Sequence, residues 1–161
     1  MRPEELERPA YEPTETSPIV GGPSDSPEYR CVVVLEPIQE GENFSGASEP
    51  VCGRGLIDSV DGVSLEALYL IAEFYDDTDC QTSLIEYYGA EPCSPTVSYG
   101  RADLREDGLD NRFASAEGFS SCDLITVYDW SSYTGPNYSC GPNCSSFHAL
   151  NDAVSSWKVA D

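Results

Sequence analysis

Basic side chains and long apolar runs are scarce in this chain. Lys and Arg number 8 against 29 Asp and Glu, so the 161 residues carry a formal net charge of -21. Such a charge repels nucleic-acid phosphates and anionic lipids, and we expect neither as a partner. No stretch approaches the roughly 18 apolar residues of a membrane-spanning helix. Cations are natural partners, although acidity equally suits a protein that must stay soluble in a saline medium.

Groups for catalysis are equally few. His148 is the only histidine, so any Ser-His-Asp or Cys-His arrangement would have to use it. No G-x-S-x-G turn and no glycine-rich phosphate loop occurs. Carboxylate pairs can be assembled anywhere in a chain with this many acids, which makes them uninformative. We therefore expect a protein that is not an enzyme.

Cysteine, in contrast, is abundant. The chain has seven cysteines and one methionine, a usage typical of oxidising compartments. The N-terminus lacks the apolar run of a signal peptide, so we expect a mature or truncated form of a secreted, extracellular protein. Because seven is odd, one thiol should stay unpaired.

Proximity in sequence favours the disulfides Cys31–Cys52 and Cys80–Cys93. The remaining cysteines and the histidine suggest either a disulfide from Cys122 to one of its neighbours or, less favoured, a zinc site; the candidates are Cys122, Cys140, Cys144 and His148. Connectivity does not follow from sequence.

Composition divides the chain into three parts. Residues 1–30 contain six prolines among Glu, Ser, Thr and Gly, which predicts a disordered acidic tail. Residues 31–69 form an N-terminal extension, with a β-strand at Cys31–Leu35 and a short helix at Ser64–Leu70 capped by Ser64. Residues 70–161 alternate short β-like segments with turns, which predicts an all-β antiparallel sandwich. The expected strands are 71–75, 83–88, 96–99, 124–128, 137–140 and 155–159.

A spaced aromatic motif stands near the C-terminus. Tyr128 and Tyr133 are followed by Gly135, so that two rings can pack across a tight turn while the glycine takes a positive φ. Residues 151–156 then read Asn-Asp-Ala-Val-Ser-Ser, which is rich in oxygen donors. Together the two motifs resemble the folded hairpin and the hexapeptide of βγ-crystallins.

An upstream copy is degenerate. The first hairpin begins at Tyr75, but Cys80 replaces the second aromatic residue and Thr82 replaces the glycine. Its hexapeptide, residues 110–115, has Ala114 where the family has Ser or Thr. The resemblance covers about half of the chain, and its second copy is the more specific.

The resemblance implies two Greek keys packed as a β-sandwich, with calcium (Ca2+) bound between the two hexapeptides. Hard cations take six or more oxygens, which tight turns supply from side chains and carbonyls. Ala114 should leave one site short of a ligand. The implied donors are the side chains of Asp110, Asn111, Asn151, Asp152 and Ser155, the carbonyls of Arg112 and Ala153, and further carbonyls of Asp76 and Asp129, which follow the corner tyrosines. Trp130 and Trp157 are expected in the core or at the hairpin corner.

We therefore expect a secreted, non-enzymatic calcium-binding protein in which calcium stabilises the fold. The alternative function is a secreted protease inhibitor or a killer-toxin-like antimicrobial of similar fold, with the segment Glu86–Arg101 as the protease-directed loop. A third possibility is an adhesion module that binds a cell-envelope component. Simple turn capping without metal is the alternative for the hexapeptides.

Deleting residues 1–30 tests the expected disorder of the tail. A segment that buries little apolar surface contributes little to the free energy of unfolding, so the thermal midpoint should stay almost unchanged. A large drop in the midpoint, measured by circular dichroism, would show that the tail packs on the domain.

Overall fold

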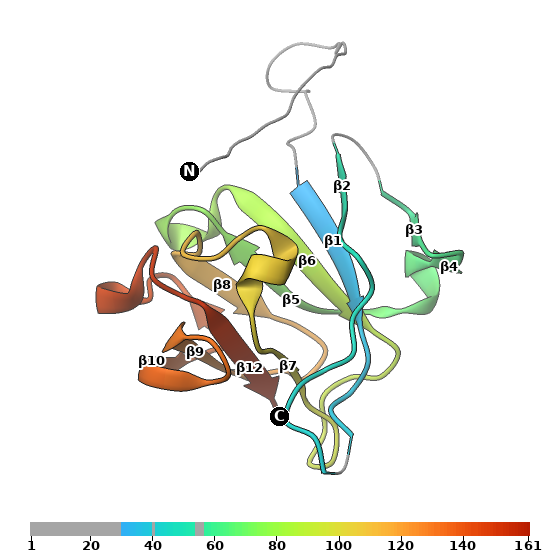
Figure 1. Ribbon diagram of the computed structural model, residues 1–161. Coiled ribbons are helices and arrows are strands. Elements are labelled where there is room, and N and C mark those ends of the chain that lie inside the picture. Colours follow the sequence, from blue (N-terminus) through green and yellow to red (C-terminus); the bar gives the residue numbers. More distant parts are fainter. Residues whose placement is uncertain (1–29, 40, 54–56) are drawn as a thin grey trace, which may run out of the picture.

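The computed structural model describes residues 30–39, 41–53 and 57–161 (Figure 1). The predicted disordered tail, apart from Arg30, lies outside the described residues. Nearly all regular structure is β-strand, joined by single turns of 3-10 helix.

Two sheets make up the described part of the chain. The six-stranded sheet has the order β11-β8-β5-β6-β1-β2 and the four-stranded sheet the order β10-β9-β12-β7. Strands of the first are β1 (Arg30–Leu35), β2 (Val51–Gly53), β5 (Tyr69–Tyr75), β6 (Ser83–Gly89), β8 (Ser115–Gly118) and β11 (Asn143–Cys144). Strands of the second are β7 (Tyr99–Arg101), β9 (Leu124–Trp130), β10 (Thr134–Cys140) and β12 (Ser156–Ala160). A small hairpin, β3 (Ser59–Val60) and β4 (Val63–Ser64), and the turns η2 (Leu65–Ala67), η3 (Thr78–Cys80), η4 (Leu104–Asp107) and η5 (His148–Leu150) complete the elements.

The strand order is that of two Greek keys that exchange their third strands. The first key is β5-β6-β7-β8, yet β7 pairs with β12 of the second key. The second key is β9-β10-β11-β12, and β11 pairs with β8 of the first. The predicted two-Greek-key sandwich is confirmed, and neither key can complete its sheet alone.

Aromatic side chains fill the space between the sheets. Phe74 stacks on Phe113 with ring centroids 4.4 Å apart, and Trp157 lies 5.0 Å from Phe74 and 4.7 Å from Tyr87. These rings have no exposed surface, so they carry much of the apolar burial that stabilises the fold. Trp157 therefore lies in the core, as expected.

Of the two expected places, the core and the hairpin corner, Trp130 takes the hairpin corner. Its side chain is 60% exposed. Gly135 lies against the ring, since a Cβ placed on it would come within 2.6 Å of Trp130 Cδ2. Gly135 also has φ +81. The missing side chain thus admits both the turn and the indole ring.

The extension is part of the first sheet. β1 pairs in parallel with β6, with Cys31 opposite Ile85, and β2 pairs antiparallel with β1. Val32, Val60 and Leu65 form a second, smaller core on this side. The predicted helix at 64–70 is shorter than expected: Ser64 accepts a hydrogen bond from Glu66 N at 3.3 Å, but only the turn η2 forms because β5 begins at residue 69.

Three disulfides are present. Cys31–Cys52 joins the paired strands β1 and β2, as predicted. The prediction of Cys80–Cys93 is wrong, because Cys93 bonds Cys122. The predicted disulfide from Cys122 to Cys140 or Cys144 is also wrong, because these two bond each other.

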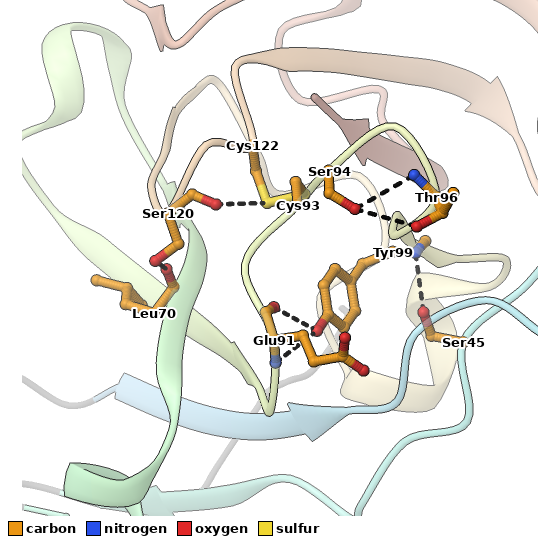
Figure 2. Close-up of a disulfide and its surroundings, with 10 residues drawn as sticks. Ser45, Leu70, Glu91, Cys93, Ser94, Thr96, Tyr99, Ser120 and Cys122 are labelled. Atoms are coloured by element: carbon orange, nitrogen blue, oxygen red, sulfur yellow. Dashed lines mark hydrogen bonds between the residues drawn. A yellow bond between two sulfur atoms is a disulfide. The ribbon is translucent and has the colours of Figure 1, made fainter.

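The backbone explains the Cys93–Cys122 pairing. Cys93 N donates to Ser120 O at 2.9 Å, which brings the β6–β7 loop against the β8–β9 loop (Figure 2). Ser120 Oγ in turn donates to Leu70 O at 2.8 Å. Long-range strand pairing has overridden proximity in sequence.

Other strands differ from the sequence expectation. The strand predicted at 96–99 begins only at Tyr99, because residues 94–97 form a turn closed by reciprocal bonds between Ser94 and Val97. β8 and β11 were not predicted. The sequence of β8, Ser-Ala-Glu-Gly, has no β-branched or aromatic residue, so only its partners on both sides make it a strand.

Cys80 is the free cysteine of the described chain and is half-buried. Burial raises the pKa of its thiol, and Ser115 opposes this with a hydrogen bond. Under native, non-reducing conditions a thiol reagent should therefore titrate one group, more slowly than an exposed cysteine. Cys80→Ser should remove that reaction. Two or more reactive thiols in the wild type would contradict the disulfide assignment.

Candidate metal centre

In each folded hairpin, a serine hydroxyl forms the same two hydrogen bonds to the hairpin backbone. Ser156 Oγ donates to Trp130 O at 2.6 Å and accepts from Tyr133 N at 3.0 Å. Ser115 Oγ donates to Asp77 O at 2.5 Å and accepts from Cys80 N at 3.0 Å. Ser115 and Ser156 are the sixth residues of the two hexapeptides, so each hexapeptide ends by fixing its own hairpin.

The degenerate first hairpin keeps the backbone of the second. Two residues take left-handed φ in each, Asp79 and Cys80 at 66° and 55°, and Ser132 and Tyr133 at 59° and 59°. In the second hairpin, the rings of Tyr128 and Tyr133 meet edge to face at 5.8 Å, as predicted.

The first hairpin replaces ring packing by hydrogen bonds. The Asp77 carboxylate accepts from Thr82 N at 2.9 Å and from Thr82 Oγ1 at 2.8 Å. These bonds lower the pKa of Asp77. Thr82, which stands where the family has glycine, thus closes the turn in another way.

The two hexapeptide loops are bonded to each other reciprocally. Asn111 N donates to Val154 O at 3.0 Å, and Asp152 N donates to Phe113 O at 2.8 Å. Asn111 and Asp152 are both second residues of their hexapeptides and have left-handed φ of 64° and 61°. The loops therefore face each other about a local pseudo-twofold axis.

The fifth residue of each hexapeptide lies beside the hairpin of its own key. Ala114 N donates to Tyr75 O, and Ser155 N donates to Tyr128 O, both at 2.9 Å. Asp76 and Asp129 directly follow these tyrosines. Seven of the nine predicted ligands can be grouped with Ala114 on these contacts, and Asp110 and Asn151 belong to neither group. We call the groups the Asp76 cluster (Asp76, Arg112, Ala114, Asp152) and the Asp129 cluster (Asn111, Asp129, Ala153, Ser155).

Charges gather in the Asp76 cluster. Arg112 Nη2 lies 3.3 Å from Asp76 Oδ2. Burial raises the pKa of Asp152, the neighbouring Asp76 raises it further, and Arg112 opposes the rise. Asp76, Arg112 and Asp152, which come from both keys, thus act on one another electrostatically, as a site shared by both hexapeptides requires.

The first residues of the hexapeptides differ. Asn151 Oδ1 accepts from Phe147 N at 2.7 Å and its Nδ2 donates to Ser146 Oγ at 3.1 Å, so its amide holds the β11–β12 loop. Asp110 Oδ1 is buried without a hydrogen-bond partner. A buried carboxylate oxygen without a partner is costly unless a cation or water meets it. A carboxylate oxygen is a ligand that a hard cation such as calcium prefers, so this atom fits such an ion.

Among the described residues, no three His, Cys, Asp or Glu side chains are grouped as a metal site. The predicted donors are largely carbonyl, amide and hydroxyl oxygens, which such a grouping does not include. The alternative zinc site lacks its thiolates, because Cys122, Cys140 and Cys144 all form disulfides.

The exchange of β7 and β11 between two hairpin-and-hexapeptide units decides the architecture. The fold is of the βγ-crystallin type.

Two solved structures are similar to this chain. One is the N-terminal domain of protein S, with 20% identity and a TM-score of 0.43 over 56% of this chain and 96% of that one. The other is a double mutant of clostrillin in complex with nickel, with 16% identity and a TM-score of 0.42 over 56% of this chain and 98% of that one. Neither the models of known protein families nor the curated proteins include a match.

Replacing Ser156 by Ala tests the pinning role of the sixth residue. The change leaves Tyr133 N and Trp130 O without their partner, and an unmade buried hydrogen bond costs about 1–3 kcal/mol. Chemical denaturation without calcium should show a loss of this size. Ser155→Ala is the matched control and should change the calcium-free stability little, since no side-chain hydrogen bond of Ser155 is present among the described residues. Equal losses in the two variants would contradict the assignment.

Proposed function

We propose that this protein binds calcium at two sites between the hexapeptide loops and that the ions stabilise its fold. The reciprocal bonds Asn111 N to Val154 O and Asp152 N to Phe113 O support the proposal best, because they bring donors from both keys to each cluster. The unpaired oxygen of Asp110 supports it further.

Calcium would act as a clamp between the two keys. In the Asp129 cluster, Asn111 N of the first key donates to Val154 O, which precedes Ser155 of the second key. An ion held by both keys is bound only when the keys are docked. A ligand that binds the native state alone stabilises it by RT ln(1 + [L]/Kd), about 2.7 kcal/mol at a hundred times Kd.

The two sites should differ in strength. Ser155 offers a hydroxyl oxygen in one cluster, whereas Ala114 offers a methyl group in the other. Calcium favours a high ligand count, so water must fill the gap beside Ala114. The Asp129 cluster is therefore the stronger site.

The protein works as a secreted, non-enzymatic module. Its three disulfides are those of a protein from an oxidising compartment. No helix in the described ranges is long and apolar enough to cross a membrane.

A second candidate function is inhibition of a secreted protease. The turn Ser94–Val97 is closed by its own backbone bonds, and Pro95 and Thr96 are exposed. The disulfide Cys93–Cys122 directly precedes it (Figure 2). A rigid exposed turn loses little entropy on binding. Assays against secreted serine, cysteine and metalloproteases would reveal this activity, and Thr96→Ala should weaken it. An adhesion role with a cell-envelope component would instead give calcium-dependent binding to intact cells.

Titration calorimetry with calcium tests the proposal. It should show a stronger and a weaker binding event. Ser155→Ala should abolish the stronger event and lower the calcium-dependent gain in thermal midpoint. Ala114→Ser should strengthen the weaker event, because it restores the missing oxygen donor.

Magnesium separates bound ions from diffuse attraction to the acidic surface. Diffuse attraction depends on ionic charge and treats the two ions alike, whereas a cage of several protein oxygens prefers the larger calcium. If magnesium raises the midpoint as much as calcium does, or if Ser155→Ala leaves the titration unchanged, the sites are wrongly assigned.

A further inference from the structure

The two clusters also differ at the third position of their hexapeptides. Arg112 occupies this position in one loop and Ala153 in the other. The backbone carbonyl is available in both cases, so the side chain is the difference. The Arg112 side chain places its guanidinium Nη2 3.3 Å from Asp76 Oδ2.

The guanidinium of Arg112 interacts with two carboxylates, those of Asp76 and Asp152. Besides its ion pair with Asp76, it acts on Asp152, whose pKa it lowers while Asp76 raises it. Asp76 and Asp152 repel each other, and Arg112 offsets that repulsion. Beside Asp76 the chain therefore already supplies a cation of its own.

Ala153 gives the Asp129 cluster no such cation. In the Asp76 cluster, a divalent ion has to enter a place where a positive charge already pairs with Asp76. Two unit charges 4 Å apart in water interact by about 1 kcal/mol, and a doubly charged ion about twice as strongly. The arginine therefore opposes calcium at one site only.

We propose that Arg112 is a built-in counter-ion that competes with calcium for the carboxylates of the Asp76 cluster. It stabilises the calcium-free protein and delays filling of that site until calcium is more concentrated. The inference rests on the proposed calcium function and extends it to the order in which the sites fill.

The competition is reversible because the ion pair is weak. The side chains of Arg112 and Asp76 are 41% and 42% exposed, and pairs exposed to this degree contribute little. Calcium can therefore displace the guanidinium, which has solvent to move into. Arg112 shifts the calcium concentration at which the site fills and does not block the site.

Arg112→Ala tests the proposal, because it makes the first loop match the second at this position. The weaker calcium event should tighten by about tenfold, between the factors that a pair of exposed charges and a divalent ion in water would give. The thermal midpoint without calcium should fall only slightly, because the exposed ion pair contributes little, and the gain in midpoint on adding calcium should grow. The stronger event at the Asp129 cluster should keep its affinity.

Arg105→Ala is the matched control. It removes the same charge, but Arg105 pairs with Asp103, which is in neither cluster, its interaction with Asp110 is smaller than that with Asp103, and its side chain is 70% exposed. It should leave both calcium events nearly unchanged. Arg112→Lys keeps a cation with a different shape and should tighten the weaker event by less than Arg112→Ala does. Arg112→Gln is a second neutral variant in case alanine disturbs the loop.

The results separate the two proposals. If the wild type shows two events and neither neutral variant, Arg112→Ala or Arg112→Gln, shifts the weaker one, the counter-ion is refuted and the calcium sites stand. Equal tightening in Arg105→Ala would also refute it, because net charge alone would then explain the change. A wild type and an Arg112→Ala variant that both fail to bind calcium would overturn both proposals. A merely structural arginine would lower the midpoint equally with and without calcium, which would refute the competition.

Discussion

The reciprocal docking of the two hexapeptide loops is the contact on which this structure depends. The third strand of each key pairs in the sheet of the other key. The loop that follows this strand contains the hexapeptide and returns across the interface to the fourth strand of its own key. Asn111 and Asp152 make that crossing with left-handed backbones and bond the opposite loop. Ser115 and Ser156 then fix the hairpins on which the loops rest. A metal ion held here would reinforce a contact that the backbone already makes.

The two Greek keys have the same backbone conformation in their hairpins and loops but different side chains. The second hairpin uses a pair of tyrosine rings and Gly135, whereas the first uses the hydrogen bonds of Asp77 to Thr82. The second loop keeps Ser155 and Ala153, whereas the first has Ala114 and Arg112. All four differences leave the fold intact. In the proposed calcium function, the two in the loops both concern the affinity for a cation, and they would make the two proposed sites unequal.

Local patterns in the sequence predicted the parts of the fold that local chemistry determines. The packing of the two tyrosine rings across the second hairpin and the positive φ of Gly135 were predicted, because such turns require particular residues at particular places. Contacts between residues distant in sequence were not predicted. Cys93 bonds Cys122 because strand pairing brings their loops together, and β8 is a strand only because β5 and β11 pair with it. The exposure of Trp130 and the pairing of Arg112 with Asp76 likewise depend on where side chains point after folding. Nine candidate ligands were named, but the grouping of seven of them into two clusters followed only from the contacts of the folded chain.

Long-wavelength anomalous diffraction from crystals grown with calcium would test the central claim most directly. The account predicts two anomalous peaks at the interface of the loops, one beside Asp129 and Ser155 and one beside Asp76 and Asp152, with the first more fully occupied. In crystals of Arg112→Ala the two occupancies should become more nearly equal. Peaks scattered over the acidic surface, or no peak between the loops, would contradict it.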